Sequence, residues 1–213
     1  MIVRVSDIVA EAVGKENVYI ATENSKIAKV VKDNGYNVIL TSDSCLTGTD
    51  RVAEASIEVD GDIIVNVQGD EPLLNPNHIQ KVIDKKIKYP NHIINCMARI
   101  ESYEDVKDTK LPKIVVNEQN ELIYSSRAPI PSSKFGVSKN PKKQVCVYAF
   151  NKEELFKFGS RKEKTPLEWC EDIEINRFLE MGMKVKMVEV NDVTHAVDFP
   201  EDVKIVEGLL NEN

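Results

Sequence analysis

The apolar positions in the first part of the chain alternate between helical spacing and short continuous runs. Helical spacing predicts amphipathic helices at residues 1–14, 25–35, 48–59 and 76–89. Continuous apolar runs predict buried strands at residues 17–24, 36–42 and 62–67. Buried strands that alternate with helices are typical of a parallel sheet covered on both faces. We therefore predict a three-layer α/β fold with a Rossmann-like, mostly parallel sheet flanked by helices.

The ends of two of these helices are predicted from their flanking residues. Gly35 follows the second helix, and glycine commonly ends a helix because it adopts the left-handed conformation without strain. Ser25 is expected to cap the start of the second helix, and Thr49 or Asp50 the start of the third.

From residue 93 the pattern changes to closely spaced strands. Strands are predicted at 93–100, 112–128 and 144–150, with a hairpin around residues 118–120. Helices are predicted at 151–160 and 166–182, a strand at 184–190, and a last helix that begins near Pro200. We expect one domain over residues 1–213, in which residues 93–150 form a strand-rich insertion.

Composition limits the partners. The 213 residues are 42% hydrophobic and 30% charged, with a net charge of −7. An acidic chain argues against a nucleic-acid or acidic-membrane surface, because phosphate binding there needs clustered Lys and Arg. No stretch is long and apolar enough to predict a membrane span, and no signal peptide opens the chain, so we expect a cytoplasmic protein. The four cysteines lack metal-site spacing and are expected to be buried free thiols.

Polar clusters follow the predicted strands, where ligands bind in parallel α/β sheets. Asp70 ends the strand at 62–67, and a carboxylate there suits Mg²⁺, although a turn or capping role remains open. Asp198 either caps the last helix or faces Asp70 as a second metal ligand. Gln68 offers hydrogen bonds to a ligand, and Gly69 permits close backbone approach or a positive φ.

A second cluster, "LTGTDR", opens the third helix. Thr47, Gly48, Thr49 and Arg51 either surround an acceptor-rich ligand or simply cap the helix. Arg127 binds a ligand carboxylate or an acidic group inside the fold.

Four motifs occur together in one order: "TGTDRVAEA", "IVNVQGDEPLL", "YSSRAPIP" and "HAVDFPEDV". This pattern resembles the 3-deoxy-manno-octulosonate cytidylyltransferases, which are relatives of the acylneuraminate cytidylyltransferases, over nearly the whole chain. The resemblance implies transfer of CMP from CTP to the anomeric hydroxyl of an acidic 2-keto sugar, with Mg²⁺ and release of pyrophosphate, for lipopolysaccharide or surface-polysaccharide synthesis. It also implies a homodimer formed through the strand-rich segment.

Carried over residue by residue, the resemblance assigns a catalytic metal pair and a set of substrate contacts. Asp70 and Asp198 resemble the metal pair. The residues that resemble nucleotide or sugar contacts are Thr47, Gly48, Thr49, Arg51, Gln68, Tyr148 and Glu174.

The chain also departs from the family pattern. Gln144 stands where the family typically has His, Ile175 where it has Gln, and Glu23 where it has Asp. A related acidic or amino-substituted sugar is therefore a second possibility. The family usually opens with a strand and a phosphate-binding loop, and this chain begins at what resembles the end of that region. We therefore expect low stability or association of this form as a monomer, and a catalytically inactive binding or assembly subunit is a third possibility.

Overall fold

The computed structural model describes residues 1–101, 103–134, 138, 140–191, 195–197 and 199–211. The helices in these ranges are α1 (Ile2–Val13), η1 (Lys15–Asn17), α2 (Ser25–Asp33), α3 (Gly48–Ala55), α4 (Pro76–Lys88), α5 (Tyr103–Lys107), α6 (Lys152–Gly159), α7 (Pro166–Glu171), α8 (Ile175–Glu180) and α9 (Pro200–Asn211). The strands are β1 (Tyr19–Thr22), β2 (Asn37–Leu40), β3 (Ile64–Val67), β4 (Ile93–Arg99), β5 (Lys113–Val116), β6 (Leu122–Ser126), β7 (Lys142–Phe150) and β8 (Val185–Glu189).

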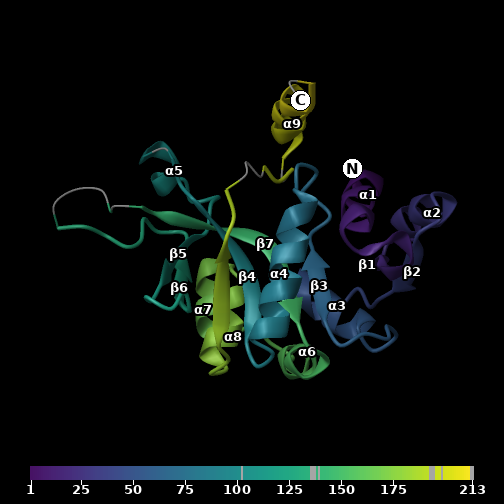
Figure 1. Ribbon diagram of the computed structural model, residues 1–213, viewed down its shortest axis with the longest axis horizontal. Helices are drawn as coiled ribbons and strands as arrows, with labels where there is room; N and C mark the ends of the chain where they lie inside the picture. The colour runs from purple at the N-terminus through teal and green to yellow at the C-terminus, as the bar shows by residue number, and fades with distance from the viewer. Residues whose placement is uncertain (102, 135–137, 139, 192–194, 198, 212–213) are drawn as a thin grey trace.

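The strands form two sheets with helices on their faces, which confirms the predicted α/β class (Figure 1). β1 and β2 make a parallel pair. The larger sheet has the order β6-β5-β7-β4-β8, with β3 on the other side of β7. β4 and β8 are parallel, whereas the long strand β7 runs antiparallel to both β3 and β4. The antiparallel position of β7 does not follow from the strand–helix alternation of the sequence.

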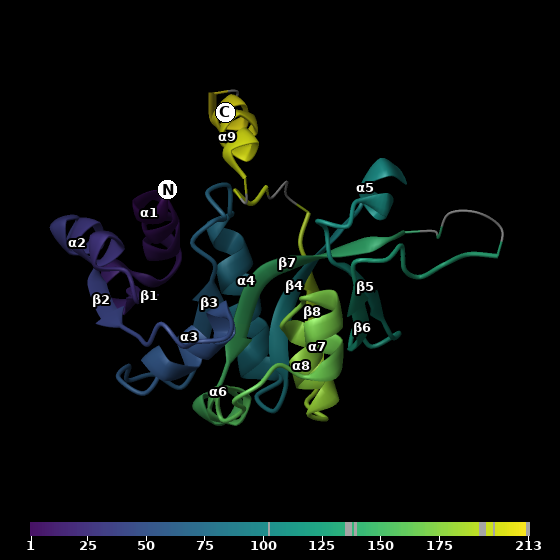
Figure 2. The same ribbon diagram turned by 180° about the vertical axis from the view of Figure 1, so that it is seen from behind.

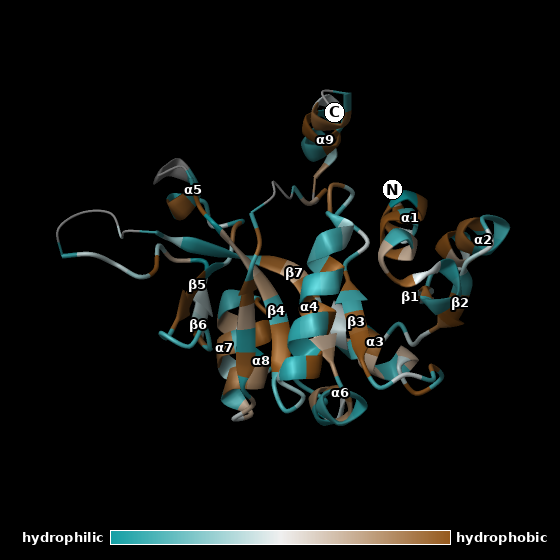
Figure 3. Cartoon of the chain, in the orientation of Figure 1, coloured by the Kyte–Doolittle hydropathy of each residue, from teal (hydrophilic) through white to brown (hydrophobic). Residues whose placement is uncertain are grey.

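Alternate residues of the central strands build two separate cores, as the two-residue period of a strand requires. One face of β4 and β7 packs Ile94, Cys96 and Val147 against α4, which lies on the face seen in Figure 1. The opposite face packs against α6 and α8, and α7 and α8 lie on the face seen in Figure 2. Figure 3 shows the same contrast, with apolar strands at the centre and polar residues along α4.

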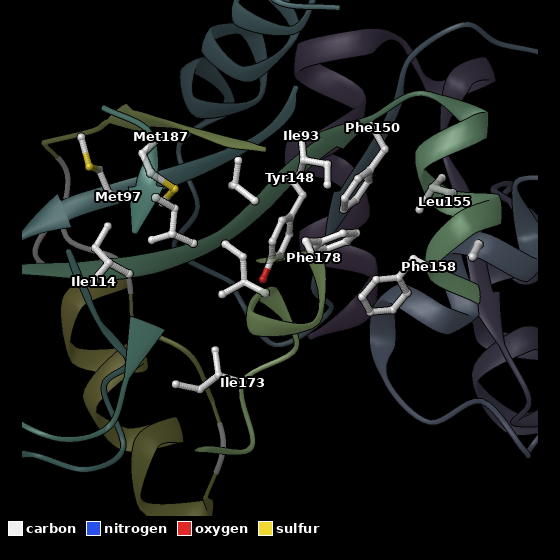
Figure 4. Packing of buried hydrophobic residues seen from close by; sticks show 14 residues of the cluster. Ile93, Met97, Ile114, Tyr148, Phe150, Leu155, Phe158, Ile173, Phe178 and Met187 are labelled. Carbon is white, nitrogen blue, oxygen red and sulfur yellow. The ribbon is translucent and has the colours of Figure 1, made fainter. Parts of the chain in front are cut away.

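The second core is rich in aromatic rings. Tyr148 and Phe150 of β7 stack with ring centroids 5.6 Å apart, and Phe150 contacts Phe178 of α8 at 5.5 Å. The ring centroids of Phe158 of α6 and Phe178 are 4.4 Å apart (Figure 4). This aromatic packing fixes α8 against the centre of the sheet.

Three helix predictions are wrong in detail. The side chain of Asn24, rather than Ser25, accepts the first backbone N–H groups of α2. Thr47, rather than Thr49 or Asp50, caps α3 by accepting the Asp50 N–H. The single helix predicted at 166–182 is broken into α7 and α8 at Asp172, which adopts the left-handed conformation with φ of 51°.

Residues 113–126 form the predicted hairpin, and Asn120 in its turn has a φ of 57°. The four cysteines are free, as expected, but the expected burial holds only for Cys96: Cys45 and Cys146 are partly buried and Cys170 is exposed. None of the helices in the described part of the chain combines the length and apolar composition that a bilayer-crossing helix needs.

Candidate active site

A cleft of about 540 Å³ separates the two sheets and contains five of the residues singled out from the sequence. β1 and β3 form its sides, and α1 and α3 contribute the remaining lining. Within the described ranges, β1 pairs only with β2 and β3 pairs only with β7 (Figure 1), so each strand has one unpaired edge, and residues of both strands line the cleft. The five residues are Gly48, Arg51, Gln68, Gly69 and Asp70.

Arg51 is held at the edge of this cleft by its neighbours. Its guanidinium pairs with the Glu23 carboxylate at 2.7 Å and donates to the Thr41 hydroxyl at 2.6 Å. A third bond reaches the Ser42 carbonyl at 3.2 Å. The guanidinium is thus fixed in position while its side chain keeps 20% exposure, which leaves room for an anionic ligand.

Asp70 lies directly beyond β3, where the sequence predicts it. Its carbonyl accepts the Val197 N–H at 2.9 Å, so the segment after β8 joins the end of β3. Asp198, the expected second metal ligand, lies outside the described residues. Gly69 lacks the positive φ that was one possibility. The other possibility, close approach, applies because a Cβ on Gly69 would come within 3.0 Å of the Ile2 Cδ1 atom.

The carboxylate of Asp70 can hold a hard cation such as Mg²⁺ only when oxygen atoms of the substrate complete the coordination. Within the described ranges, no group of three His, Cys, Asp or Glu side chains is arranged as a metal centre. Mg²⁺ needs only one or two protein carboxylates, because water and phosphate oxygens complete its octahedral shell. A single described carboxylate at a strand end is therefore compatible with Mg²⁺ brought by a nucleotide.

A second polar group lies beneath α3 and is centred on Glu174. The break at Asp172 places Glu174 at the start of α8, where its carboxylate accepts the Thr49 N–H at 3.1 Å and the Thr49 hydroxyl at 2.8 Å. The charge of Glu174 also acts on the Tyr148 side chain. Burial raises the pKa of Glu174 above its ordinary value, and the Thr49 donors oppose this shift.

Three polar residues continue this group across the sheet. Asn66 of β3 and Asn95 of β4 are both register partners of Tyr148 on β7. The side chains of Asn66, Tyr148 and Asn95 therefore form a row on one face of the sheet. Gln144 donates to the Tyr148 hydroxyl at 2.6 Å and to the Asn95 side-chain oxygen at 3.2 Å. Burial, followed by the charge of Glu174, raises the pKa of Tyr148 well above its ordinary value. The hydroxyl therefore remains protonated and serves as a hydrogen-bond donor.

Thr49 connects the cleft to this polar group. Thr49 is fully buried, and its hydroxyl also accepts from the Asn66 amide at 3.3 Å. Asn66 and Asn95 were missed by sequence reasoning, although a polar residue inside a continuous apolar strand is a usable signal. The structure thus brings together the "LTGTDR", "NVQGD" and "QVCVY" segments.

Arg127 and Ile175 stand apart from both groups. The Arg127 guanidinium donates to the backbone carbonyls of Glu171 at 2.6 Å, Asp172 at 3.0 Å and Thr109 at 2.9 Å. These contacts favour the internal role that the sequence left open. Ile175 is fully buried among the core residues, so it presents no surface to a ligand.

Comparison with known proteins shows which family the chain resembles. Residues 1–185 match the family model described as cytidylyltransferase. The 3-deoxy-manno-octulosonate cytidylyltransferase of Zea mays is 35% identical over 99% of this chain and 72% of its own length. The corresponding protein of Syntrophotalea carbinolica is 34% identical over 99% of this chain and 88% of its own length.

Solved structures agree with the sequence comparison. A CMP:2-keto-3-deoxy-manno-octonic acid synthetase complexed with CTP superposes with a TM-score of 0.91 and 26% identity, covering 99% of this chain and 87% of that chain. An inositol-1-phosphate CTP transferase from T. maritima shares the fold alone, with a TM-score of 0.61 and 20% identity over 97% of this chain and 80% of that chain. On this evidence, the chain belongs to the cytidylyltransferase family.

Proposed function

We propose that this protein transfers CMP from CTP to an acidic 2-keto sugar, 3-deoxy-manno-octulosonate or a close relative. The sugar's anomeric hydroxyl oxygen forms a bond to the α-phosphorus of CTP, the bond to the β-phosphate breaks, pyrophosphate leaves and the hydroxyl proton is released. One observation carries the proposal: Asn66, which lines the cleft, donates to the Thr49 hydroxyl, and Thr49 donates to Glu174, so the cleft and the Glu174 group adjoin as two neighbouring substrate sites require.

The nucleotide side is assigned to the cleft. Arg51 supplies positive charge, and the amide of Gln68 supplies hydrogen bonds to a base or a hydroxyl group. Gly48 lies beside Gln68, because a Cβ on Gly48 would be only 3.9 Å from the Gln68 amide nitrogen. Thr47 caps α3 and Gly48 is its first residue, where the helix dipole favours phosphate oxygens, while the next two N–H groups already bond to Glu174 and Thr47.

Asp70 and Asp198 are the proposed ligands of Mg²⁺. When bound, this ion neutralises negative charge on the phosphates and holds the two reacting groups together. The Val197 bond to the Asp70 backbone supports this pairing, because it joins the two segments on which these carboxylates are carried. This chain therefore supplies one carboxylate from each segment to the proposed Mg²⁺ site, Asp70 after β3 and Asp198 after β8.

The sugar side is assigned to Glu174, with Tyr148 and Gln144 as buried supporting residues, because Tyr148 is only 1% exposed. Glu174 is only partly buried and accepts hydrogen bonds, which suits sugar hydroxyl groups. Gln144 is almost fully buried and bonds to Tyr148, so it positions the tyrosine hydroxyl and has limited reach to a ligand. An acidic sugar other than 3-deoxy-manno-octulosonate is the second candidate. Gln144 stands where the family typically has His, and glutamine cannot gain the positive charge that a histidine can.

The test is pyrophosphate release from CTP with a panel of acidic octulosonic and nonulosonic sugars. Release that requires one of these sugars and a divalent cation supports the proposal. No release with any sugar contradicts it and favours the inactive binding subunit. The mass of the CMP-sugar product then separates the two candidate sugar classes.

The surroundings of the enzyme follow as further proposals. We place the protein in the cytoplasm, in the synthesis of lipopolysaccharide or surface polysaccharide, as a homodimer formed through residues 93–150. Sedimentation of a monomer at micromolar concentration contradicts the dimer, and recovery of the protein with a membrane fraction contradicts the location.

A further inference from the structure

Two consecutive residues of α3 are bound by two residues of α8 that lie one helical turn apart. Thr49 donates to Glu174 through its N–H and hydroxyl, as described above. The next residue, Asp50, accepts two bonds from the Arg177 guanidinium, at 2.7 Å and 3.0 Å. Residues three apart share one face of a helix, so this face of α8 holds the first turn of α3 at two successive positions.

Arg177 is built into an enclosed site. It is fully buried, and its guanidinium lies 3.9 Å from the centre of the Phe158 ring. Its Nε atom donates to Glu168 at 2.6 Å, and one terminal nitrogen donates to the other Glu168 oxygen. Glu168 in turn accepts the Thr165 N–H and closes the capping box of α7. The planar guanidinium thus fixes Asp50 relative to both α7 and α8.

Stability alone is a weak reason for such a cluster. A buried ion pair often adds little to the free energy of folding, because desolvation of the charges offsets their attraction. The attested use of buried charges is to specify one arrangement of the elements that carry them. Here the elements are α8, which presents Glu174, and α3, whose first turn presents Arg51 to the cleft.

The connection extends to the α3 cap. Asp50 accepts the Thr47 hydroxyl at 2.8 Å as well as the two Arg177 bonds. A displacement of Asp50 therefore moves Thr47, Gly48 and Arg51 together, relative to Glu174. These are the residues assigned above to the nucleotide and sugar sides.

We propose that Arg177 is a positioning residue of the transfer reaction, which fixes the first turn of α3 and so sets the distance between the nucleotide and sugar groups. This inference rests on the proposed function. Bimolecular transfer depends steeply on this distance, because a shift of about 1 Å between reacting groups costs roughly 100-fold in rate.

The test compares Arg177→Lys with Lys86→Met. Lysine keeps the charge but loses the planar fork that holds Asp50 and Glu168 together. Lys86 is the matched control, because it is 2% exposed and pairs with Glu154 at 2.6 Å, between α4 and α6. We expect Arg177→Lys to lower kcat roughly 10- to 100-fold. We expect Lys86→Met to lower the melting temperature and to leave kcat and both KM values unchanged.

Amide hydrogen exchange gives a second readout that does not need turnover. In Arg177→Lys, exchange should accelerate at Thr49, Asp50 and Arg51 while β4 and β7 keep their protection. If Arg177→Lys does not fold, Asp50→Asn replaces it, because it preserves side-chain shape and should accelerate exchange at the same turn.

The outcomes separate a positioning role of Arg177 from a purely structural role. Faster exchange confined to the α3 turn, with reduced kcat, supports the positioning role. Wild-type kcat in Arg177→Lys, or acceleration spread over the whole fold as in Lys86→Met, overturns it. If the wild-type protein releases no pyrophosphate, the proposed function fails, and the exchange pattern alone decides whether Arg177 fixes the turn.

Discussion

Replacing Tyr148 by Phe tests whether the buried polar row is a connected network. The substitution keeps the ring that stacks on Phe150 and removes only the hydroxyl. That hydroxyl accepts from the Gln144 amide at 2.6 Å, and the charge of Glu174 acts on it. The side chain is 1% exposed, so water does not replace these bonds.

The expected loss follows from this one bond and from burial. A neutral hydrogen bond contributes about 0.5–1.5 kcal/mol, and a buried group left without its partner costs about 1–3 kcal/mol. Gln144 retains Asn95 as a partner, which keeps the loss in the lower part of these ranges. We therefore expect the free energy of unfolding to fall by about 1.5 kcal/mol. For a chain of 213 residues this lowers the melting temperature by roughly 3–6 °C.

Urea unfolding followed by far-ultraviolet circular dichroism measures this change. Trp169 fluorescence is less suitable, because that side chain is 75% exposed. Tyr36→Phe is the matched control, since the Tyr36 hydroxyl donates to the Asp7 carboxylate at 2.5 Å, outside the proposed site. It should cost about 2 kcal/mol and leave the KM for the sugar unchanged.

For Tyr148→Phe we expect the KM for the sugar to rise roughly tenfold, because the polar group beside Glu174 loses the hydroxyl that Gln144 holds in place. A loss of stability below about 0.5 kcal/mol would refute the connected network, since a buried hydroxyl that accepts a hydrogen bond cannot be removed so cheaply. An equal rise in the KM for the sugar in both variants would refute its specific role in the site.

Three further predictions follow from the site and the cleft. Asp70→Asn and Asp198→Asn should each lose most turnover with unchanged circular dichroism, and retained Mg²⁺-dependent turnover in either variant contradicts the metal assignment. Burial raises the pKa of Glu174 above the ordinary 4.5, so the native state binds more protons than the unfolded state. The free energy of unfolding should therefore fall as the pH rises from 4.5 to the raised pKa of Glu174. Glu174→Gln should reduce the slope of the unfolding free energy against pH. An unchanged slope in urea titrations excludes Glu174 as its source. Amides of β1 and β3 that face the cleft should exchange faster than those of β4 and β7, and equal protection contradicts the open strand edges.

Much of the site was predictable because short-range patterns encode it. The apolar run before Asp70 predicts a buried strand, and ligands bind at the carboxyl ends of such strands. The same logic placed Arg51 and Gln68 at strand-to-helix junctions, and the cleft contains both. Asn66 and Asn95 were missed because sequence spacing does not show that both stand beside Tyr148.

By itself, the sequence determined the α/β class, the position of most helices and strands, and the family pattern, because hydrophobic periodicity and local motifs depend on neighbouring residues. Only the tertiary structure decided where the polar side chains meet. The break at Asp172 is an example: its carbonyl accepts from Arg127, 45 residues away. That break turns Glu174 towards Thr49, 125 residues away, and allows Arg177 to reach Asp50 at a separation of 127 residues. Long-range contacts of this kind carry no local signal, because the energy of a left-handed turn or a buried charge depends on partners that only the folded chain brings together.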